Sequence, residues 1–439
     1  MRPELTRNPG PFENAAGSRM PTASDLIAAV PAFCRLLRSQ RDDAEVRRER
    51  RTRRLEAVLR AAVSLPSYRR SFGGTPGPDE LAALPLLSRS GVAELLGDVR
   101  ASRPGTGSIP RVRTSGSSGE PIWLLFDPRH QRGRFAARAR YLWENGWRPQ
   151  HRSAWMIGIL PGSPDGELTR SRGLGGARFF SHVEDFARQV EWLRALDPAH
   201  LYTLPSNLEA IVHLIEARGV RLRSLRTVFT SGEVVEEALR ERVRRVLGVE
   251  IADGYGTTEA FLGWQCPAGS YHVNDEHVVV EIVDRAGRPA APGTVGRVLF
   301  TTLENLVMPL VRYEIDDFAE AVEGPCACGR TLSRIGRIHG RAMNLFRMPG
   351  GALLSPWKLV EPLRDLPTVR RSQVIQHDLE RFTVRFVSDV PPEARVTQRI
   401  REQLVGLVGP HARFAFERVD DIPRTGRGKF MSTICELAR

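Results

Sequence analysis

The sequence lacks any apolar run approaching the ~20 residues that a membrane-spanning helix needs. No basic segment followed by an apolar stretch opens the chain, so we expect a cytoplasmic protein without an export signal. Its five cysteines are too unevenly spaced for a disulfide framework. These absences argue against the membrane-spanning and disulfide-stapled classes. They leave a globular chain whose 439 residues are enough for two or three domains.

Lysine is almost absent. Of the 64 basic residues, 62 are arginine, and the only lysines are Lys358 and Lys429. The net charge of +13 raises the possibility of a nucleic-acid partner, but the arginines are scattered rather than gathered in one stretch. We therefore expect neither a nucleic-acid nor a membrane partner. A lysine retained in such a chain is expected where a compact, movable ammonium cannot be replaced by a planar guanidinium.

The chain divides into three parts by amino-acid composition and by the pattern of its apolar residues. Residues 1–24 are rich in Pro, Gly, Ser and Asn and predict a flexible tail. Residues 25–341 predict a large layered α/β domain, because short apolar runs at 154–160 and 227–230 alternate with helical patterns such as 237–247. An amphipathic helix is expected within residues 43–65, with Leu55, Val58, Leu59 and Ala62 on its apolar side. Residues 345–439 predict a small α+β domain, with strands near 372–376, 383–388 and 413–418 and a helix near 393–408.

A loop rich in glycine and hydroxyl groups is the sharpest local signal. Residues 113–121 read Arg-Thr-Ser-Gly-Ser-Ser-Gly-Glu-Pro. Such a loop can turn tightly and offer backbone N–H and hydroxyl donors to a polyphosphate. It is not a Walker loop, because no Gly-Lys-Ser/Thr follows. By itself the pattern is also that of an ordinary linker.

Two further clusters follow predicted strands, at residues 230–233 and 253–259. Each is either a plain turn or a ligand-binding strand end, the place where open α/β sheets bind ligands. Tyr255 offers a flat face for a base, and Glu259 offers an oxygen ligand for Mg²⁺. Near the C-terminus, residues 421–429 read Asp-Ile-Pro-Arg-Thr-Gly-Arg-Gly-Lys and present Lys429 on a glycine-containing loop or a frayed basic tail.

Taken in order, these segments resemble the signatures of the adenylate-forming superfamily. The loop at 114–121, the Tyr-Gly-x-Thr-Glu at 255–259 and the Pro-Arg-Thr-x-x-Gly-Lys at 423–429 carry the likeness. The stretches 66–69, 202–206, 231–233 and 309–313 are similar to the phenylacetate–CoA ligase branch, which includes CapK-like and coenzyme F390 synthetase-like proteins. The resemblance implies a large adenylation domain at 25–341, followed by a small mobile lid domain at 345–439.

The resemblance also implies an activity. ATP and Mg²⁺ would convert an aromatic carboxylic acid to an acyl-adenylate with release of pyrophosphate, and CoA would then take the acyl group. Lys429 and Glu259 would be catalytic, with Glu259 binding Mg²⁺. Nucleotide contacts would come from Thr114, Ser115, Gly116, Ser117, Ser118, Gly119, Ser231, Gly232, Glu233, Gly254, Tyr255, Gly256, Thr257, Thr258, Asp317 and Arg341. The acid pocket is expected near residues 155–160, 202–206 and 260–261.

The sequence departs from the family pattern at the hinge. The stretch before Asp317 reads Arg-Tyr-Glu-Ile-Asp-Asp, and Met343 and Asn344 stand where an acidic hinge residue is expected after Arg341. Adenylation is therefore better supported than transfer to CoA, and an amine, a carrier-protein thiol or another nucleophile is the alternative acceptor. A third interpretation, a nucleic-acid binder on a retired adenylation fold, is disfavoured by the retained Glu259, Asp317 and Lys429.

Four residues on two loops predict a structural zinc site. Cys266, His272, Cys326 and Cys328 form a Cys₃His set, which suits closed tetrahedral zinc, and similar sites occur in the branch that the chain resembles. His277 is the competing histidine. The branch also suggests a homodimer, whereas the identity of the acid has no readable code.

Overall fold

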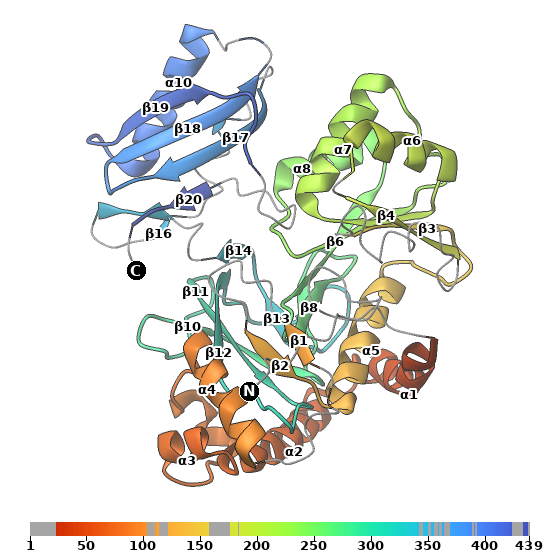
Figure 1. Ribbon diagram of the computed structural model, residues 1–439, viewed down its shortest axis with the longest axis vertical. Helices are drawn as coiled ribbons and strands as arrows, with labels where there is room; N and C mark the ends of the chain where they lie inside the picture. The colour runs from red at the N-terminus through yellow and green to blue at the C-terminus, as the bar shows by residue number, and fades with distance from the viewer. Residues whose placement is uncertain are drawn as a thin grey trace, which may run out of the picture. The chain divides into compact units, whose positions relative to one another are not determined.

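The computed structural model (Figure 1) has two compact units, one built from the chain up to Ile315 together with Ala319–Arg337, the other from Asp316–Phe318 and the chain from Ile338 onward. The structure describes residues 23–102, 109, 111–113, 122–157, 176–182, 184–341, 346–349, 353–354, 359, 362–363, 369–388, 390, 393–423 and 433–437. An α/β fold with a second, smaller α+β unit is thus confirmed.

Helices open the first unit: α1 (Ala23–Ser39), α2 (Ala44–Val63), α3 (Pro66–Phe72) and α4 (Arg89–Ser102). The predicted amphipathic helix is confirmed as α2. The Asp43 carboxylate caps it by accepting from the backbone N–H of Glu45 at 2.7 Å. Its four predicted apolar residues are all buried. The helix α1 begins at Ala23, inside the segment expected to be a tail, because its apolar residues pack against α5 (Pro128–Glu144). The rest of that expected tail lies outside the described residues.

A large sheet forms the centre of the first unit. Within the described residues its strand order is β13-β9-β8-β7-β6-β5-β3-β4. The strands β4, β3, β5, β6 and β7 run parallel, whereas β8 and β9 are antiparallel to their neighbours. Their bounds are β3 (Ser153–Ile157), β4 (Ala177–Ser181), β5 (His200–Thr203), β6 (Thr227–Ser231), β7 (Glu250–Gly256), β8 (Phe261–Gln265), β9 (Tyr271–Val273) and β13 (Arg334–Ile335). The strands expected at 154–160 and 227–230 are therefore β3 and β6, although residues 158–160 lie outside the described ranges.

Three helices cover the parallel strands: α6 (Phe186–Leu196), α7 (Pro205–Arg218) and α8 (Glu237–Leu247) (Figure 1). Their apolar residues recur every three or four positions, as with Leu208, Ile211, Val212 and Ile215 of α7, and pack against β3, β5 and β6 in one core cluster. The helix α8 has the predicted bounds and ends at Gly248, whose φ of 70° is one that glycine adopts readily.

Shorter elements complete the first unit. The strands β10 (Val278–Val283), β11 (Val295–Thr302) and β12 (Tyr313–Glu320) lie side by side in a second sheet. A small hairpin joins β1 (Arg111–Arg113) to β2 (Trp123–Leu125), and the 3₁₀ helix η1 spans Pro78–Ala83. The division between the two units runs through β12, because Asp316–Phe318 belong to the second unit.

In the described part of the second unit, the sheet β19-β18-β17-β20 is packed against a helix, and β15 pairs with β16 separately. The strands of this unit are β14 (Ile338–Arg341), β15 (Phe346–Arg347), β16 (Leu353–Leu354), β17 (Val369–Gln376), β18 (Arg381–Ser388), β19 (Arg413–Arg418) and β20 (Thr433–Cys435). The helix α10 (Ala394–Val408) buries Ile400, Leu404 and Val408 against Val374 and Phe382 of β17 and β18. The predictions of strands near 372, 383 and 413 and of a helix near 393–408 are confirmed.

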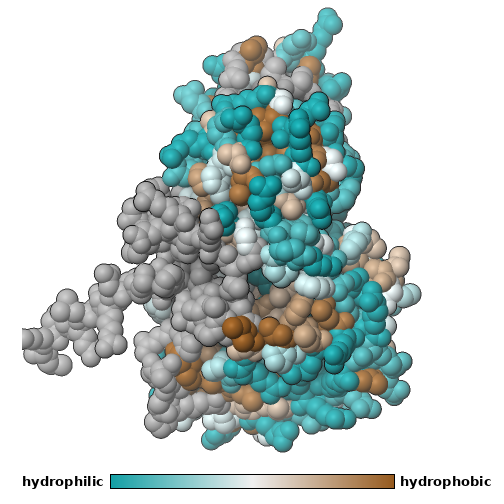
Figure 2. Space-filling view, turned by 90° about the vertical axis from the view of Figure 1, so that its right-hand side faces the viewer, coloured by the Kyte–Doolittle hydropathy of each residue, from teal (hydrophilic) through white to brown (hydrophobic). Residues whose placement is uncertain are grey.

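Polar residues are expected on the surface of a globular chain in which 26% of the residues are charged. The face drawn in Figure 2 is largely hydrophilic, with hydrophobic residues scattered among polar ones. Among the described helices, none combines the length and apolar character needed to cross a bilayer.

Candidate functional site

Two predicted clusters meet at the carboxyl edge of the large sheet. The strand β6 ends at Ser231 and the parallel strand β7 ends at Gly256, and Ser231 is paired in register with Gly254. The segments at 230–233 and 253–259 therefore lie side by side, as the alternation of strands and helices predicts. A strand edge of this kind is where open α/β sheets bind ligands.

The residues after β6 hold the end of β5 in place. The Glu233 carboxylate accepts hydrogen bonds from the backbone N–H of Ser206 at 2.9 Å and from its hydroxyl at 3.2 Å. The hydroxyls of Ser231 and Tyr202 are 2.5 Å apart, and the Tyr202 ring stacks on Trp155 with 4.7 Å between centroids. Two stretches that the sequence singled out separately, 202–206 and 231–233, thus form one structure. Its aromatic wall comes from β3 and β5.

A tight turn joins β7 to β8. The backbone N–H of Thr257 donates to the carbonyl of Ala260 at 2.9 Å, and the Thr257 hydroxyl accepts from the N–H groups of Glu259 and Ala260. A Cβ on Gly256 would lie 2.8 Å from the Ala260 oxygen, so only glycine fits where the two strands approach. Phe261, expected near the acid pocket, is buried in the core cluster around Tyr141, and Ala260 is fully buried.

Glu259 is contacted at two different groups, its carboxylate and its backbone oxygen. The residue is 5% exposed, and the Tyr313 hydroxyl lies 3.4 Å from Oε1. The buried His130 ring donates from Nε2 to the Glu259 backbone oxygen at 2.9 Å. Sequence reasoning missed His130 and gave Tyr313 no such role, because neither lies within the motif and only the fold brings α5 and β12 to it. No local pattern could have shown either contact.

Asp253 lies buried at the start of the same segment. Its two carboxylate oxygens accept from the Thr230 and Tyr271 hydroxyls, each at 2.6 Å. Burial raises the pKa of the Asp253 carboxyl from 3.8 to about 6, although these hydrogen bonds oppose the rise. The group therefore titrates within the range in which enzymes are assayed.

The remaining predicted site residues belong to the second unit or lie outside the described residues. Asp317 is on β12 within the part that belongs to the second unit, and only the backbone of Arg341, at the end of β14, is described. The loop at 114–119 and Lys429 lie outside the described residues. The structure thus brings together the residues at 231–233 and 254–259.

The four predicted zinc ligands converge. The Sγ atoms of Cys266, Cys326 and Cys328 and a ring nitrogen of His272 all lie within 4.8 Å of one another. Two tight turns achieve this. Gly269 closes the turn after β8 with a φ of 80°, and Gly329 N–H donates to the Cys326 oxygen at 3.0 Å. Three of the four side chains are buried, as a closed structural site requires.

The spacing of these atoms fits a tetrahedral ion. A Zn–S bond of about 2.3 Å gives a sulfur–sulfur edge of about 3.8 Å. The Sγ atoms of Cys266 and Cys326 are 3.8 Å apart, and Nε2 of His272 lies 3.2 Å from Sγ of Cys328. His277 is not in the group. Its Nδ1 lies 3.0 Å from the Glu304 carboxylate, and its ring stacks on His130.

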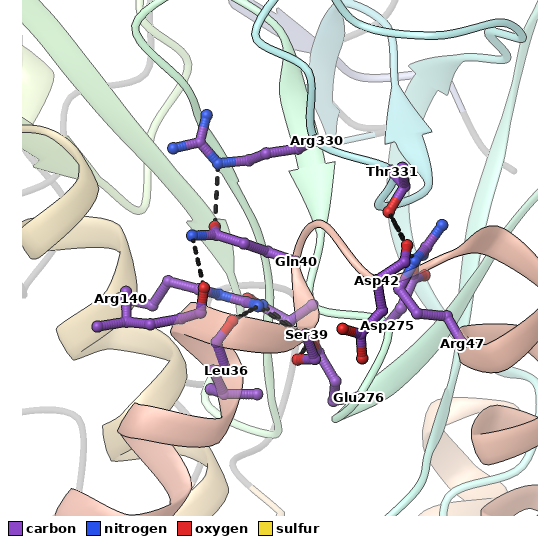
Figure 3. A network of polar contacts seen from close by, with 12 residues as sticks. Leu36, Ser39, Gln40, Asp42, Arg47, Arg140, Asp275, Glu276, Arg330 and Thr331 are labelled. Carbon is purple, nitrogen blue, oxygen red and sulfur yellow. Dashed lines mark hydrogen bonds and ion pairs between the residues drawn. The ribbon is translucent and has the colours of Figure 1, made fainter.

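A polar network joins this cysteine loop to the N-terminal helices (Figure 3). Arg330, two residues after Cys328, donates from Nε to the Gln40 side chain at 2.9 Å. The Thr331 hydroxyl donates to the Asp42 carbonyl at 2.6 Å. The loop that carries two of the thiols is therefore fixed against the connection between α1 and α2.

Comparison with known proteins places this geometry in a family. A family model described as AMP-binding enzyme matches residues 174–307, which include the strand ends described above. A second model, described as the CapK C-terminal domain, matches residues 347–436.

Curated relatives and a solved structure agree. Phenylacetate-coenzyme A ligase of Thermus thermophilus is 28% identical over 335 residues, covering 71% of this chain and 73% of that protein. The enzyme of the same name from Escherichia coli is 26% identical over 409 residues, covering 85% and 91%. The fold matches that of a 2-hydroxyisobutyryl-CoA ligase in the postadenylation state, with a TM-score of 0.71, 20% identity and 91% coverage of each chain. With both family models in chain order, these matches confirm the resemblance seen in the sequence: the chain belongs to the adenylate-forming superfamily.

Proposed function

We propose that the protein activates a carboxylic acid, of the aromatic class, as its acyl-adenylate and then transfers the acyl group to the thiol of CoA. The observation that carries this proposal is the buried Glu259 carboxylate, which is held at the end of β7 beside the residues that follow β6. The phenylacetate-coenzyme A ligases among the relatives support the choice of acid and of acceptor.

The chemistry assigns a role to each part of the site. The substrate carboxylate attacks the α-phosphorus of ATP, and pyrophosphate leaves. Glu259 would hold Mg²⁺, which when bound neutralises charge on the phosphates. Tyr255 would face the adenine, with Ser231, Gly232, Glu233, Gly254, Gly256, Thr257 and Thr258 around it. Thr114, Ser115, Gly116, Ser117, Ser118 and Gly119 would bind the phosphates, Asp317 and Arg341 the ribose side, and Lys429 the α-phosphate and the acid.

ATP–pyrophosphate exchange tests the first half-reaction. We expect exchange with one member of a panel of aromatic acids, and a loss of roughly 10²–10³ in rate for Glu259→Gln and for Lys429→Ala. Glu56→Gln is the matched control, because it makes the same Glu-to-Gln change at an exposed position of α2, outside the strand-end cluster at 231–233 and 254–259. Absence of exchange with every acid in well-folded protein would overturn the proposal.

The acceptor is tested separately by product analysis. With CoA present, we expect the acyl-CoA thioester to accumulate and AMP release to depend on CoA. The altered hinge at Met343 and Asn344 is the reason to include an amine and a carrier-protein thiol as alternative acceptors. If adenylate forms but CoA does not accelerate its consumption, one of these is the acceptor. The same assay with residues 345–439 removed tests whether they act as the lid.

We further propose that Cys266, His272, Cys326 and Cys328 hold a structural zinc ion. The convergence of their four ligand atoms within 4.8 Å supports it, and four protein ligands would leave no open position on a tetrahedral ion for a substrate. Elemental analysis of purified protein is expected to find one zinc per chain, lost in Cys326→Ser and kept in Cys34→Ser. The exposed Cys34 is the matched control, since it lies on α1 away from the cluster. Zinc retained by Cys326→Ser would refute the site.

A further inference from the structure

An arginine-lined pocket lies within the first unit, and none of its lining residues belongs to the strand-end cluster. Its volume is about 590 Å³, within the range of small-molecule sites. It is bounded by α1, α2 and α5 and by the segment between β9 and β10. Six arginines line it: Arg35, Arg38, Arg47, Arg50, Arg51 and Arg54.

Three of these arginines are paired within the wall. Arg47 lies 2.9 Å from the Asp275 carboxylate, and Arg54 lies 3.2 Å from that of Glu304. Arg50 is paired with Asp42. The remaining acidic residue of the wall, Glu276, is neutralised from behind by Arg140, which does not line the pocket.

The other three arginines form no such pair. Among the described ranges, no carboxylate forms an ion pair with Arg35, Arg38 or Arg51, although the charge of Arg51 opposes the rise that burial causes in the pKa of the Asp275 carboxyl. Six arginines against four carboxylates give the lining a net charge of +2, and the buried Arg140 behind Glu276 adds one further positive charge. A solvated basic helix face would need no cavity, whereas this one is hollowed to the size of a ligand.

The floor of the pocket is rigid (Figure 3). Arg140, with no exposed surface, donates to the Leu36 carbonyl at 3.1 Å, to the Asn274 side chain at 2.7 Å and to both Glu276 oxygens. The Ser39 hydroxyl donates to Glu276 at 2.5 Å. These bonds fix Glu276 against Arg140, so its charge cannot turn to neutralise the surplus arginines.

We propose that this pocket binds a small polyanion that carries phosphate, a phosphate ester or a diphosphate. Guanidinium groups offer paired N–H donors in a planar fork that matches phosphate oxygens. The net positive charge of the lining, with Arg35 and Arg38 free of ion pairs among the described residues, suits an anion of two or more charges such as a diphosphate. None of the lining residues belongs to the strand-end cluster, so the pocket is a second site, independent of the proposed function.

Calorimetric titration with inorganic pyrophosphate and with inorganic phosphate tests the proposal. The titrations use the full chain in EDTA at constant ionic strength. Because pyrophosphate would also enter an ATP site, the comparison is between variants. We expect Arg51→Gln to weaken one binding event by at least about tenfold, as loss of a charge-assisted bond does. Arg60→Gln, an exposed arginine on the same helix outside the pocket, is expected to bind as the wild type does.

A second variant covers failure to fold. Arg38→Gln changes an exposed arginine of α1, and it is expected to reduce the same event with an unchanged melting temperature. Raising the salt concentration is expected to weaken this event in the wild type. Identical titrations for wild type, Arg51→Gln and Arg38→Gln, or no binding of either probe to the wild type, would overturn the proposal.

Discussion

Asp253 makes stability depend on pH in a direction opposite to that of most carboxylates. In the folded protein its pKa is raised by burial from 3.8 to about 6. Between these values the folded state keeps a proton that the unfolded state has released. Stability is therefore lost as the pH rises from about 4 to above 6. The rise in pKa corresponds to a loss of about 3 kcal/mol.

Replacing Asp253 with Asn removes this titration. The unfolding free energy of Asp253→Asn, minus that of the wild type, is expected to increase by about 3 kcal/mol between pH 4 and pH 7. Asn presents one acceptor oxygen to two hydroxyl donors, which lowers the variant's stability by an offset. The prediction is the change with pH in the difference between the two unfolding free energies, not the size of that difference at one pH.

Urea unfolding followed by tryptophan fluorescence measures the slope, because Trp264 is fully buried in the same sheet. The exposed Asp79→Asn is the control for the substitution itself, and its effect is expected to stay within about 0.5 kcal/mol. A difference between Asp253→Asn and wild type that is flat or falls as pH rises would refute the reasoning.

Two more predictions concern the pocket wall. A Cβ at Gly133 would lie 1.9 Å from Glu304 Oε2, so Gly133→Ala must displace the carboxylate that bonds His277. We expect a loss of about 1–2 kcal/mol by thermal unfolding despite the better helix propensity of alanine, and equal or higher stability would contradict it. Arg140→Met leaves the part-buried Glu276 with only the Ser39 hydroxyl as a partner and is expected to cost roughly 2–4 kcal/mol in urea unfolding, whereas a loss below about 1 kcal/mol would show that Glu276 finds another donor.

Elements with a local signal could be predicted from the sequence. The helix α2 carries its apolar residues at helical spacing after an Asp cap, and α8 ends at a glycine. The predicted bounds of both helices are therefore close to the observed ones. The Cys₃His cluster was found because cysteine is rare enough in this chain for each one to be noticed. The small number of cysteines indicated the cluster, whereas the spacing of the cysteines along the chain alone did not.

Features that depend on long-range contacts could not be predicted. The beginning of α1 depends on packing against α5, more than 100 residues later. The contact of His130 with Glu259 likewise joins a helix to a strand end 129 positions away. The sequence does not show that β7 is followed by an antiparallel strand, because nothing in the residue types of β7 or β8 indicates the direction of either strand.

The turn from β7 to β8 has a consequence for the thermodynamics of ligand binding. Its backbone bonds and the glycine at 256 fix residues 257–260 in the free protein, whereas a loop leading to a crossover helix would have to be ordered by its ligand. Immobilising a side chain on binding costs about 0.5–1.5 kcal/mol, and a turn that is already closed avoids the corresponding backbone cost. The binding free energy of a nucleotide at this edge is therefore reduced little by the cost of ordering the backbone.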